Sequence, residues 1–206
     1  MFDLPIFKNE RDVEIPLLLN WLDRNDARYA SVLDVGCALS AYLPEVQKLV
    51  GYIHGIDIQY DKKIVPYLDE YIVEDFLYAD LGYYDYVFSI STIEHVGVEY
   101  LPTKLYRELQ LEFFSKIVEL SKRGFFLTFP YGENDLFAGK YYNGNRRVLD
   151  NYLKIARGCK IYKKFISTPD QKDPWGWREI PQELADKATN ELSGGVRTIC
   201  VLEGYK

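Results

Sequence analysis

The stretch from Ser31 to Ser40, SVLDVGCALS, constrains the fold of this chain more than any other. Its aliphatic run over 31–35 predicts a buried strand, Gly36 predicts a tight turn, and a helical pattern follows from about Ala41. Strand, glycine turn and helix in this order are typical of the first half of a nucleotide-binding βα unit. An acid near the strand tip, Asp34, and no lysine after the turn indicate that this is not a phosphate-cradling loop.

Length and composition limit the class of protein. A chain of 206 residues with 48% hydrophobic residues is long and apolar enough for one folded domain with a full core. A net charge of −6 gives no strong nucleic-acid signal. We expect no membrane span and no signal peptide, because the sequence lacks an apolar run of about 18 residues and an apolar N-terminal region.

The cysteines and histidines indicate neither disulfides nor a metal site. Cys37, Cys159 and Cys200 are odd in number and scattered, which predicts free thiols in a reducing, cytoplasmic compartment. His54 and His95 stand apart from them, so we expect no bound metal.

Hydrophobic periodicity predicts alternating strands and helices along the whole chain. Gly51 and Gly124 are expected to end the helices that precede them. The predicted strands are 31–35, 52–56, 70–73, 84–90, 125–129, 160–167 and 196–202, and the predicted helices are 13–24, 41–50, 64–68, 104–121, 148–156 and 182–189.

This order predicts an α/β fold with a doubly wound, seven-stranded, mostly parallel sheet and helices on both faces. The helix over 13–24 covers one edge of the sheet or forms a lid over a ligand. Ligands of such sheets bind outside the carboxyl ends of the strands. Asp34, Asp57, Asp75, Ser91 and Pro130 all lie at predicted strand ends, so the site is expected there.

Asp34 and Asp57 are the strongest candidate pair. An acid that ends the second strand of such a sheet accepts hydrogen bonds from both hydroxyls of a ribose. The structural alternative is that both are ordinary acids at helix N-termini, favoured by the helix dipole. Gly36 alone stands where a GxGxxG motif carries three glycines, which argues against a pyrophosphate on this turn and against a nicotinamide oxidoreductase.

The segments VLDVGC, GIDI, EDF, YDYVFSISTIEHVG and FFLTFPYG follow one another over about residues 31–132. In order and spacing they resemble the motifs of class I, Rossmann-like, S-adenosylmethionine-dependent methyltransferases. The resemblance implies strand order 3-2-1-4-5-7-6, with six parallel strands and one antiparallel strand. It also implies a single domain over residues 1–206, with 1–30 as an N-terminal helical cover, and S-adenosyl-L-methionine as cofactor.

The resemblance further implies cofactor contacts at nine positions that match the family's motifs. They are Asp34, Gly36 and, in the same turn, Cys37 at the methionine moiety; Asp57 at the ribose; Ile58 beside the adenine; Asp75 and Phe76 at the adenine; and Ser91 and Thr92 beside the sulfonium. The second and third glycines of the family's first motif are missing after Gly36.

His95 is the candidate catalytic residue. Ser91 and Glu94 fit a capping box, which would place His95 in the first turn of a helix near the mouth of the site. A histidine there can take a proton from a hydroxyl or amine acceptor. The alternative is that His95 only packs at the helix end.

Two segments, 131–147 and 168–190, are expected to be insertions on the substrate side. The candidate substrate-binding residues are Tyr131, Arg146, Arg147, Trp175 and Trp177. Aromatic rings suit a sugar, and arginines suit a phosphate or carboxylate. The alternatives are a solvated helix flank for the arginines and a loop anchored on the sheet edge for the tryptophans.

FPYG followed by NRRVLD also resembles, more loosely, methyltransferases of surface-polysaccharide pathways. The sequence therefore predicts methyl transfer to a small-molecule or saccharide-like acceptor. The alternatives are a non-catalytic cofactor-binding module or partner subunit of the same fold, and, third, a nicotinamide oxidoreductase. Oligomeric state is left open, with a homodimer as one alternative.

Overall fold

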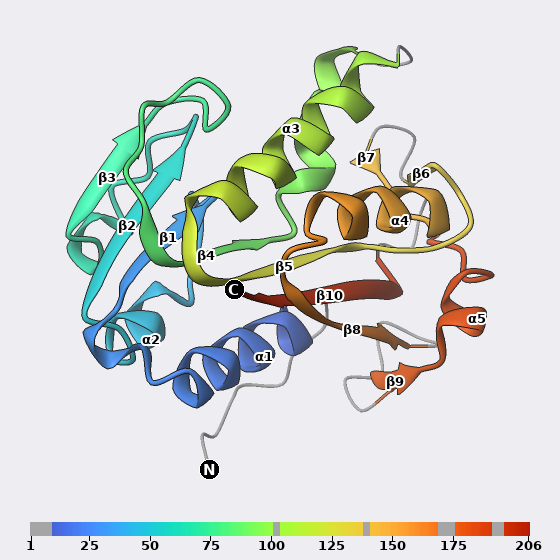
Figure 1. Ribbon diagram of the computed structural model, residues 1–206, viewed down its shortest axis with the longest axis horizontal. Coiled ribbons are helices and arrows are strands. Elements are labelled where there is room, and N and C mark those ends of the chain that lie inside the picture. The colour runs from blue at the N-terminus through green and yellow to red at the C-terminus, as the bar shows by residue number, and fades with distance from the viewer. Residues whose placement is uncertain (1–9, 101–103, 138–140, 169–175, 191–195) are drawn as a thin grey trace.

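The computed structural model describes residues 10–100, 104–137, 141–168, 176–190 and 196–206, and its core is one mixed sheet between two helical layers (Figure 1). The sheet has the order β3-β2-β1-β4-β5-β10-β8-β9. Its strands are β1 (Ser31–Val35), β2 (Tyr52–Asp57), β3 (Glu70–Val73), β4 (Tyr84–Ile90), β5 (Ser121–Pro130), β8 (Lys160–Ser167), β9 (Arg178–Ile180) and β10 (Thr198–Tyr205).

The strand pairings confirm the predicted topology. Strands β3, β2, β1, β4 and β5 pair in parallel, and β10 runs antiparallel between β5 and β8. The predicted order 3-2-1-4-5-7-6 is therefore correct for the first seven strands. An eighth strand, β9, adds antiparallel to β8 and was not predicted. A separate hairpin pairs β6 (Leu136–Phe137) with β7 (Tyr141–Tyr142).

Helices cover both faces of the sheet, as predicted. Figure 1 shows α3 and α4 over one face and α1 and α2 over the other. The α-helices are α1 (Arg11–Arg24), α2 (Leu43–Gln47), α3 (Leu105–Leu120), α4 (Arg146–Ile155) and α5 (Gln182–Ala185). Short 3₁₀ helices are η1 (Ala27–Tyr29), η2 (Val65–Tyr67), η3 (Ile93–His95) and η4 (Val98–Tyr100).

The two helical layers enclose two apolar clusters, and β5 contributes to both. Adjacent residues of a strand point to opposite faces of the sheet. Phe125 accordingly packs edge-on against Phe114 of α3, with ring centroids 5.4 Å apart, whereas Phe126 lies 5.6 Å from Trp21 of α1. The central strands are buried on both faces, which explains their nearly continuous apolar sequences.

Several predicted boundaries were wrong. Gly124 does not end α3; the helix stops at Leu120, because Ser121 is already extended and its hydroxyl donates to the Ile117 carbonyl at 2.6 Å. Gly124 lies inside β5, where a Cβ atom would come within 2.5 Å of the Gly204 carbonyl oxygen. The helices predicted over 41–50 and 182–189 are shortened to α2 and α5, and β10 extends to Tyr205.

We predict that Phe114→Ala lowers the free energy of unfolding by about 3–5 kcal/mol, because it leaves a cavity in the layer beneath α3. Phe114 is fully buried between Phe125 and Tyr152. Leu105→Ala, on the same helix but 42% exposed, is the control and should cost less than about 1 kcal/mol. Urea denaturation measures both; equal losses would contradict this assignment of the core.

Candidate functional site

The turn after β1 is packed against the residue that follows β4. Gly36 has φ +86°, and a Cβ atom on it would come within 2.2 Å of Thr92 Oγ1. The Gly36 N–H donates to the Ile56 carbonyl of β2 at 2.8 Å. Gly36 and Thr92, two of the candidate cofactor residues, therefore lie in contact at the carboxyl ends of β1 and β4. The buried Cys37 side chain points under β2, toward Gly55, so only its backbone faces the turn.

Asp57 fixes the other side of this turn. Its Oδ2 accepts a hydrogen bond from the Ala38 N–H at 2.9 Å, and its Oδ1 accepts one from the Gln59 N–H at 2.8 Å. Each carboxylate oxygen has a second lone pair, so the oriented group retains capacity for further donors. Beside it, Ile58 is 69% exposed and Leu39 is 78% exposed. An anchored carboxylate thus lies next to uncovered apolar side chains at one edge of the sheet.

Asp75 and Phe76 follow β3. The Asp75 side chain lies on the surface, and the Phe76 side chain lies in the core. The exposed Asp75 accepts a hydrogen bond from the Leu77 N–H at 2.9 Å. The Phe76 ring is buried edge-on against Phe113 at 4.9 Å. Within the described part of the chain, the Phe76 backbone N–H donates to no group. A carboxylate and an adjacent unused backbone donor are the groups that can read the edge of a planar heterocycle.

Asp34 lies below the turn, in the core. It is fully buried, and both of its oxygens lie 3.1–3.2 Å from the Tyr42 hydroxyl. Burial raises the pKa of Asp34 well above its usual value, and the hydrogen bond from Tyr42 opposes that rise. Asp34 is therefore already engaged within the protein.

The sequence did not point to Arg11 and Glu14 of α1, yet both lie at this edge. Arg11 Nη1 donates to Glu14 Oε2 and to the Ile90 carbonyl at the end of β4, at 3.0 Å in each case. Glu14 is fully buried, and the Ser91 hydroxyl donates to its Oε1 at 2.5 Å. A signal for Glu14 was present, because it shares the buried face of α1 with Leu18.

The predicted capping box does not form. The Ser91 hydroxyl is bound to Glu14, its N–H donates to Thr128, and the following element is one turn of 3₁₀ helix without a side-chain cap. Ser91 itself has φ +42°, a strained conformation for serine. His95 ends this turn and is exposed, with its ring edge-on to Tyr141 at 4.6 Å.

The predicted substrate residues are brought together in part. The buried Tyr131 donates its hydroxyl proton to Asp186 at 2.5 Å, and Arg146 Nη1 reaches the same carboxylate at 3.1 Å. Arg147 lies apart, 3.8 Å from Asp135. Trp177 is half-buried, and its indole N–H has no hydrogen-bond partner among the residues placed by the structure. Trp175 lies outside the described residues.

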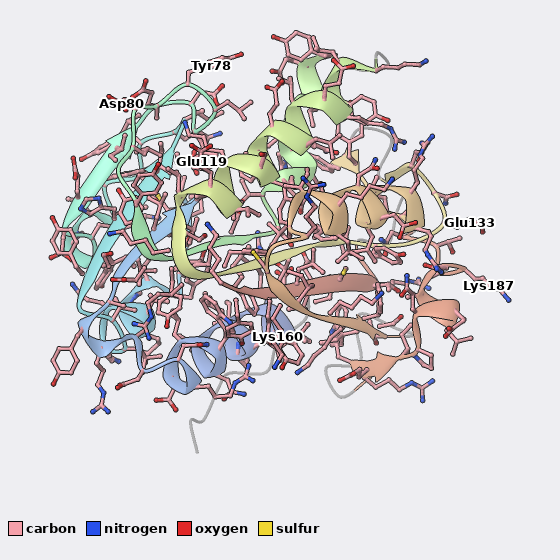
Figure 2. The ribbon with its side chains drawn as sticks, in the orientation of Figure 1. Tyr78, Asp80, Glu119, Glu133, Lys160 and Lys187 are labelled. Atoms are coloured by element: carbon pink, nitrogen blue, oxygen red, sulfur yellow. The ribbon has the colours of Figure 1, made fainter. Side chains whose placement is uncertain are left out.

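The two predicted insertions are joined to each other. The Glu133 N–H donates to the Ala188 carbonyl at 2.8 Å, and the side chains of Glu133 and Lys187 project at the same end of the molecule (Figure 2). Asn190 adds a hydrogen bond to the Asn143 side chain at 2.7 Å. The described parts of the two insertions, 131–137, 141–147 and 176–190, therefore form one connected unit beyond the end of β5.

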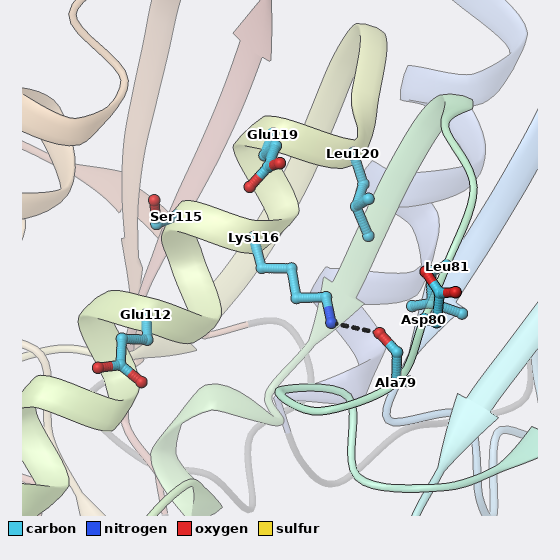
Figure 3. A pocket seen from close by; sticks show the side chains of 8 residues that line it. All are labelled: Ala79, Asp80, Leu81, Glu112, Ser115, Lys116, Glu119 and Leu120. Atoms are coloured by element: carbon cyan, nitrogen blue, oxygen red, sulfur yellow. Dashed lines mark hydrogen bonds between the residues drawn. The ribbon is translucent and has the colours of Figure 1, made fainter.

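An open hollow of about 430 Å³ lies elsewhere, between α3 and the segment before β4 (Figure 3). Its lining includes Asp80, Glu112 and Glu119, and Lys116 donates to the Ala79 carbonyl at 2.7 Å. It reaches Leu120, where β5 begins, and thus lies at the amino ends of β4 and β5, away from Gly36. We do not assign the functional site to it.

Two negative findings apply to the described ranges of the chain. None of the helices in them is long and apolar enough to cross a membrane. No three histidine, cysteine, aspartate or glutamate side chains in them are grouped so that they could hold a metal ion.

The fold is that of class I S-adenosylmethionine-dependent methyltransferases, as the sequence motifs predicted. No protein-family model and no curated protein sequence matches this chain. Solved structures match it over nearly its whole length, at identities that establish the fold alone.

Three of these structures illustrate the likeness. Magnesium protoporphyrin IX methyltransferase from Synechocystis PCC 6803, with bound S-adenosylmethionine, is 13% identical with a TM-score of 0.60, over 95% of this chain and 80% of that one. N-methyltransferase NodS from Bradyrhizobium japonicum WM9, with S-adenosylhomocysteine, is 12% identical with a TM-score of 0.59, over 96% and 88%. The methyltransferase domain of bacterial CtHen1 is 16% identical with a TM-score of 0.57, over 94% and 98%.

We predict that Gly36→Ala strongly destabilises the protein or displaces the turn after β1, because the added Cβ meets Thr92 and the positive φ disfavours alanine. Gly82→Ala is the control, since nothing lies within 4 Å of a Cβ atom there. Thermal unfolding followed by circular dichroism should give a clearly lower Tm for Gly36→Ala only. Unchanged Tm values for both variants would contradict the close packing of Gly36 on Thr92.

Proposed function

We propose that this protein is an S-adenosylmethionine-dependent methyltransferase that acts on a small-molecule or saccharide-like acceptor. The observation that carries the proposal is Asp57, anchored at the tip of β2 by the Ala38 and Gln59 N–H groups with lone pairs left for a ribose diol. The fold supports it, because neighbouring structures of this fold hold S-adenosylmethionine or S-adenosylhomocysteine.

In this proposal each strand end binds a different part of the cofactor. Asp57 accepts hydrogen bonds from the ribose hydroxyls, and Ile58 covers the adenine. Asp75 and the Phe76 N–H bind the adenine edge. Gly36 and Cys37 form a turn that the methionine moiety of the cofactor can approach closely. Ser91 and Thr92 border the sulfonium. Asp34, bound to Tyr42, supports the turn from below.

Arg11 extends this set at the methionine end. Its guanidinium lies beside the ends of β1 and β4, where Ile90 and Glu14 hold it. A guanidinium suits a carboxylate because it can donate two parallel hydrogen bonds. We therefore assign Arg11 to the cofactor carboxylate and α1 to the role of a cover over this end of the site.

The chain's own part in methyl transfer is positioning and proton removal. When bound, the sulfonium supplies an activated methyl group. The protein must hold the acceptor in line with that group and exclude water. His95, exposed beside Tyr141 after β4, is proposed to accept a proton from an acceptor hydroxyl or amine. A carboxylate acceptor would need no base.

The connected unit of 131–137, 141–147 and 176–190 is proposed to form the acceptor side of a single domain. Tyr131 and Arg146 meet at Asp186, and Trp177 carries an indole N–H without a partner in the described ranges. Aromatic faces and polar donors suit a sugar ring. Neighbouring structures support a small acceptor, since one of them holds 1,6-didemethyltoxoflavin.

Calorimetric titration with S-adenosylmethionine, S-adenosylhomocysteine and NAD tests the cofactor. Binding of the two methionine nucleosides without NAD is expected, and binding of NAD alone would overturn the proposal. Incubation with labelled S-adenosylmethionine and a panel of sugars and small hydroxylated or amine compounds then separates an enzyme from a non-catalytic binding module.

We predict that Asp57→Ala weakens S-adenosylhomocysteine binding by roughly 10- to 100-fold, because a charge-assisted acceptor for the ribose is lost. Calorimetry gives the Kd, and circular dichroism confirms that the variant is folded. Asp80→Ala, an exposed aspartate in the loop between β3 and β4 (Figure 2), should bind like the unaltered protein. Equal affinity of the Asp57 variant would refute its assignment to the ribose.

We predict that His95→Ala leaves S-adenosylhomocysteine affinity unchanged and lowers kcat by about 100-fold or more on a hydroxyl or amine acceptor, because the proton acceptor is missing. Glu99→Ala, an exposed change four residues further on, is the control. Turnover is measured on the acceptors that the panel identifies. A variant with full kcat would assign His95 to packing against Tyr141 alone.

A further inference from the structure

One buried acid at this edge of the sheet lacks the partners that the others have. Among the described residues, four carboxylates are at most 5% exposed: Glu14, Asp34, Glu94 and Glu203. Three of them accept hydrogen bonds from the protein: Glu14 from Arg11 and Ser91, Asp34 from Tyr42, and Glu203 from Arg24 and Tyr205. Glu94 is 4% exposed, and its Oε2 has no partner in this described part of the chain.

A buried carboxyl oxygen without a hydrogen-bond partner is costly in either protonation state, so its retention calls for a ligand. Glu94 lies in η3, between Thr92, which packs on Gly36, and the exposed His95. The local backbone is fixed, because the Gln110 side chain donates to the Ile93 carbonyl at 3.0 Å. The unpaired oxygen therefore belongs to a rigid turn directly beside the proposed cofactor site.

The charges around Glu94 favour a cationic ligand. Burial raises the pKa of Glu94 to about 8, while its own backbone N–H and Arg11 lower it and Glu14 and Glu10 raise it. Glu94 in turn helps to raise the pKa of the buried Tyr152 hydroxyl on α4, after the larger effect of burial. The side chains that act on one another here are one base, Arg11, and three acids, Glu10, Glu14 and Glu94. Acids therefore outnumber bases in this group.

We propose that Glu94 binds the ammonium group of the cofactor's methionine end, an inference that rests on the proposed function. An ammonium carries three N–H donors, and Glu94 Oε2 is a buried acceptor without one. The sequence had pointed to Asp34 for the methionine moiety, but Asp34 is fully buried beneath the turn, where it accepts a hydrogen bond from the Tyr42 hydroxyl. Arg11 and Glu94 together then match the two opposite charges of an amino-acid group.

This assignment couples binding to proton release. Without ligand, the raised pKa keeps Glu94 protonated at pH 7. An ammonium placed beside it stabilises the ionised form and lowers the pKa, so Glu94 loses its proton to the solvent as the ligand binds. S-adenosylhomocysteine carries the same ammonium and carboxylate as S-adenosylmethionine, so both should show the effect.

Calorimetry at pH 7 in phosphate and in Tris, buffers of different ionisation enthalpy, counts the released protons. With S-adenosylhomocysteine, the unaltered protein should release close to one proton. Glu94→Gln should bind roughly 10- to 100-fold more weakly and release none. Glu99→Gln, an exposed change on the neighbouring η4, should behave like the unaltered protein.

5′-Methylthioadenosine, which lacks the amino-acid group, provides a second measurement that needs no variant. It should bind the unaltered protein without proton release. Its affinity for the Glu94→Gln variant should equal its affinity for the unaltered protein. Buffer-independent binding of S-adenosylhomocysteine to the unaltered protein, or full affinity of Glu94→Gln, would overturn the role of Glu94 and leave the proposed function standing. Failure of both methionine nucleosides to bind the unaltered protein would overturn both.

Discussion

The turn after β1 closes because Gly36 has no side chain, and the rest of the site depends on that closure. With Gly36 at φ +86° and packed on Thr92, the chain reverses directly over the end of β4. The reversal brings the Ala38 N–H to Asp57 at the tip of β2, at 2.9 Å. A larger residue at position 36 would separate β1 from β4 and remove the donor that orients Asp57. One steric constraint thus positions groups from three strands.

The helix that covers this edge is held by buried charge rather than by apolar packing alone. Glu14 is fully buried and accepts hydrogen bonds from both Arg11 and Ser91. Ser91 is 77 residues from Glu14 along the chain, and the Ile90 carbonyl that Arg11 also binds is 79 residues from Arg11. Buried ion pairs seldom add much net stability, but removal of one partner is costly. The network therefore fixes where α1 begins on the sheet. It also keeps a guanidinium at the strand ends, where a purely apolar contact would leave none.

The fold could be predicted from local sequence because its strands are apolar runs bounded by glycines and acids. The predicted limits of β1, β3, β4 and β8 match the structure, and those of β2 differ by one residue. The site was less accessible, since its decisive contacts join distant segments: Ser91 fits a capping box locally, yet its hydroxyl is taken by Glu14. Arg11 carries no local signal at all, and Asp186, which joins Tyr131 to Arg146, lies 40 residues beyond Arg146.

The cofactor side and the acceptor side of the proposed site are built differently, so they differ in which residues can be substituted without disturbing the sheet. The cofactor side rests on strand ends whose positions follow from the sheet, with Asp57 and Gly36 fixed by backbone hydrogen bonds. The acceptor side rests on two insertions held together by side chains, chiefly Asp186 and Asn190. Substitutions there can reshape the acceptor surface without disturbing the sheet. Glu94 follows β4 in a turn that Gln110 holds, and its Oε2 has no partner in the described ranges. In the proposed site this residue links ligand binding to proton release.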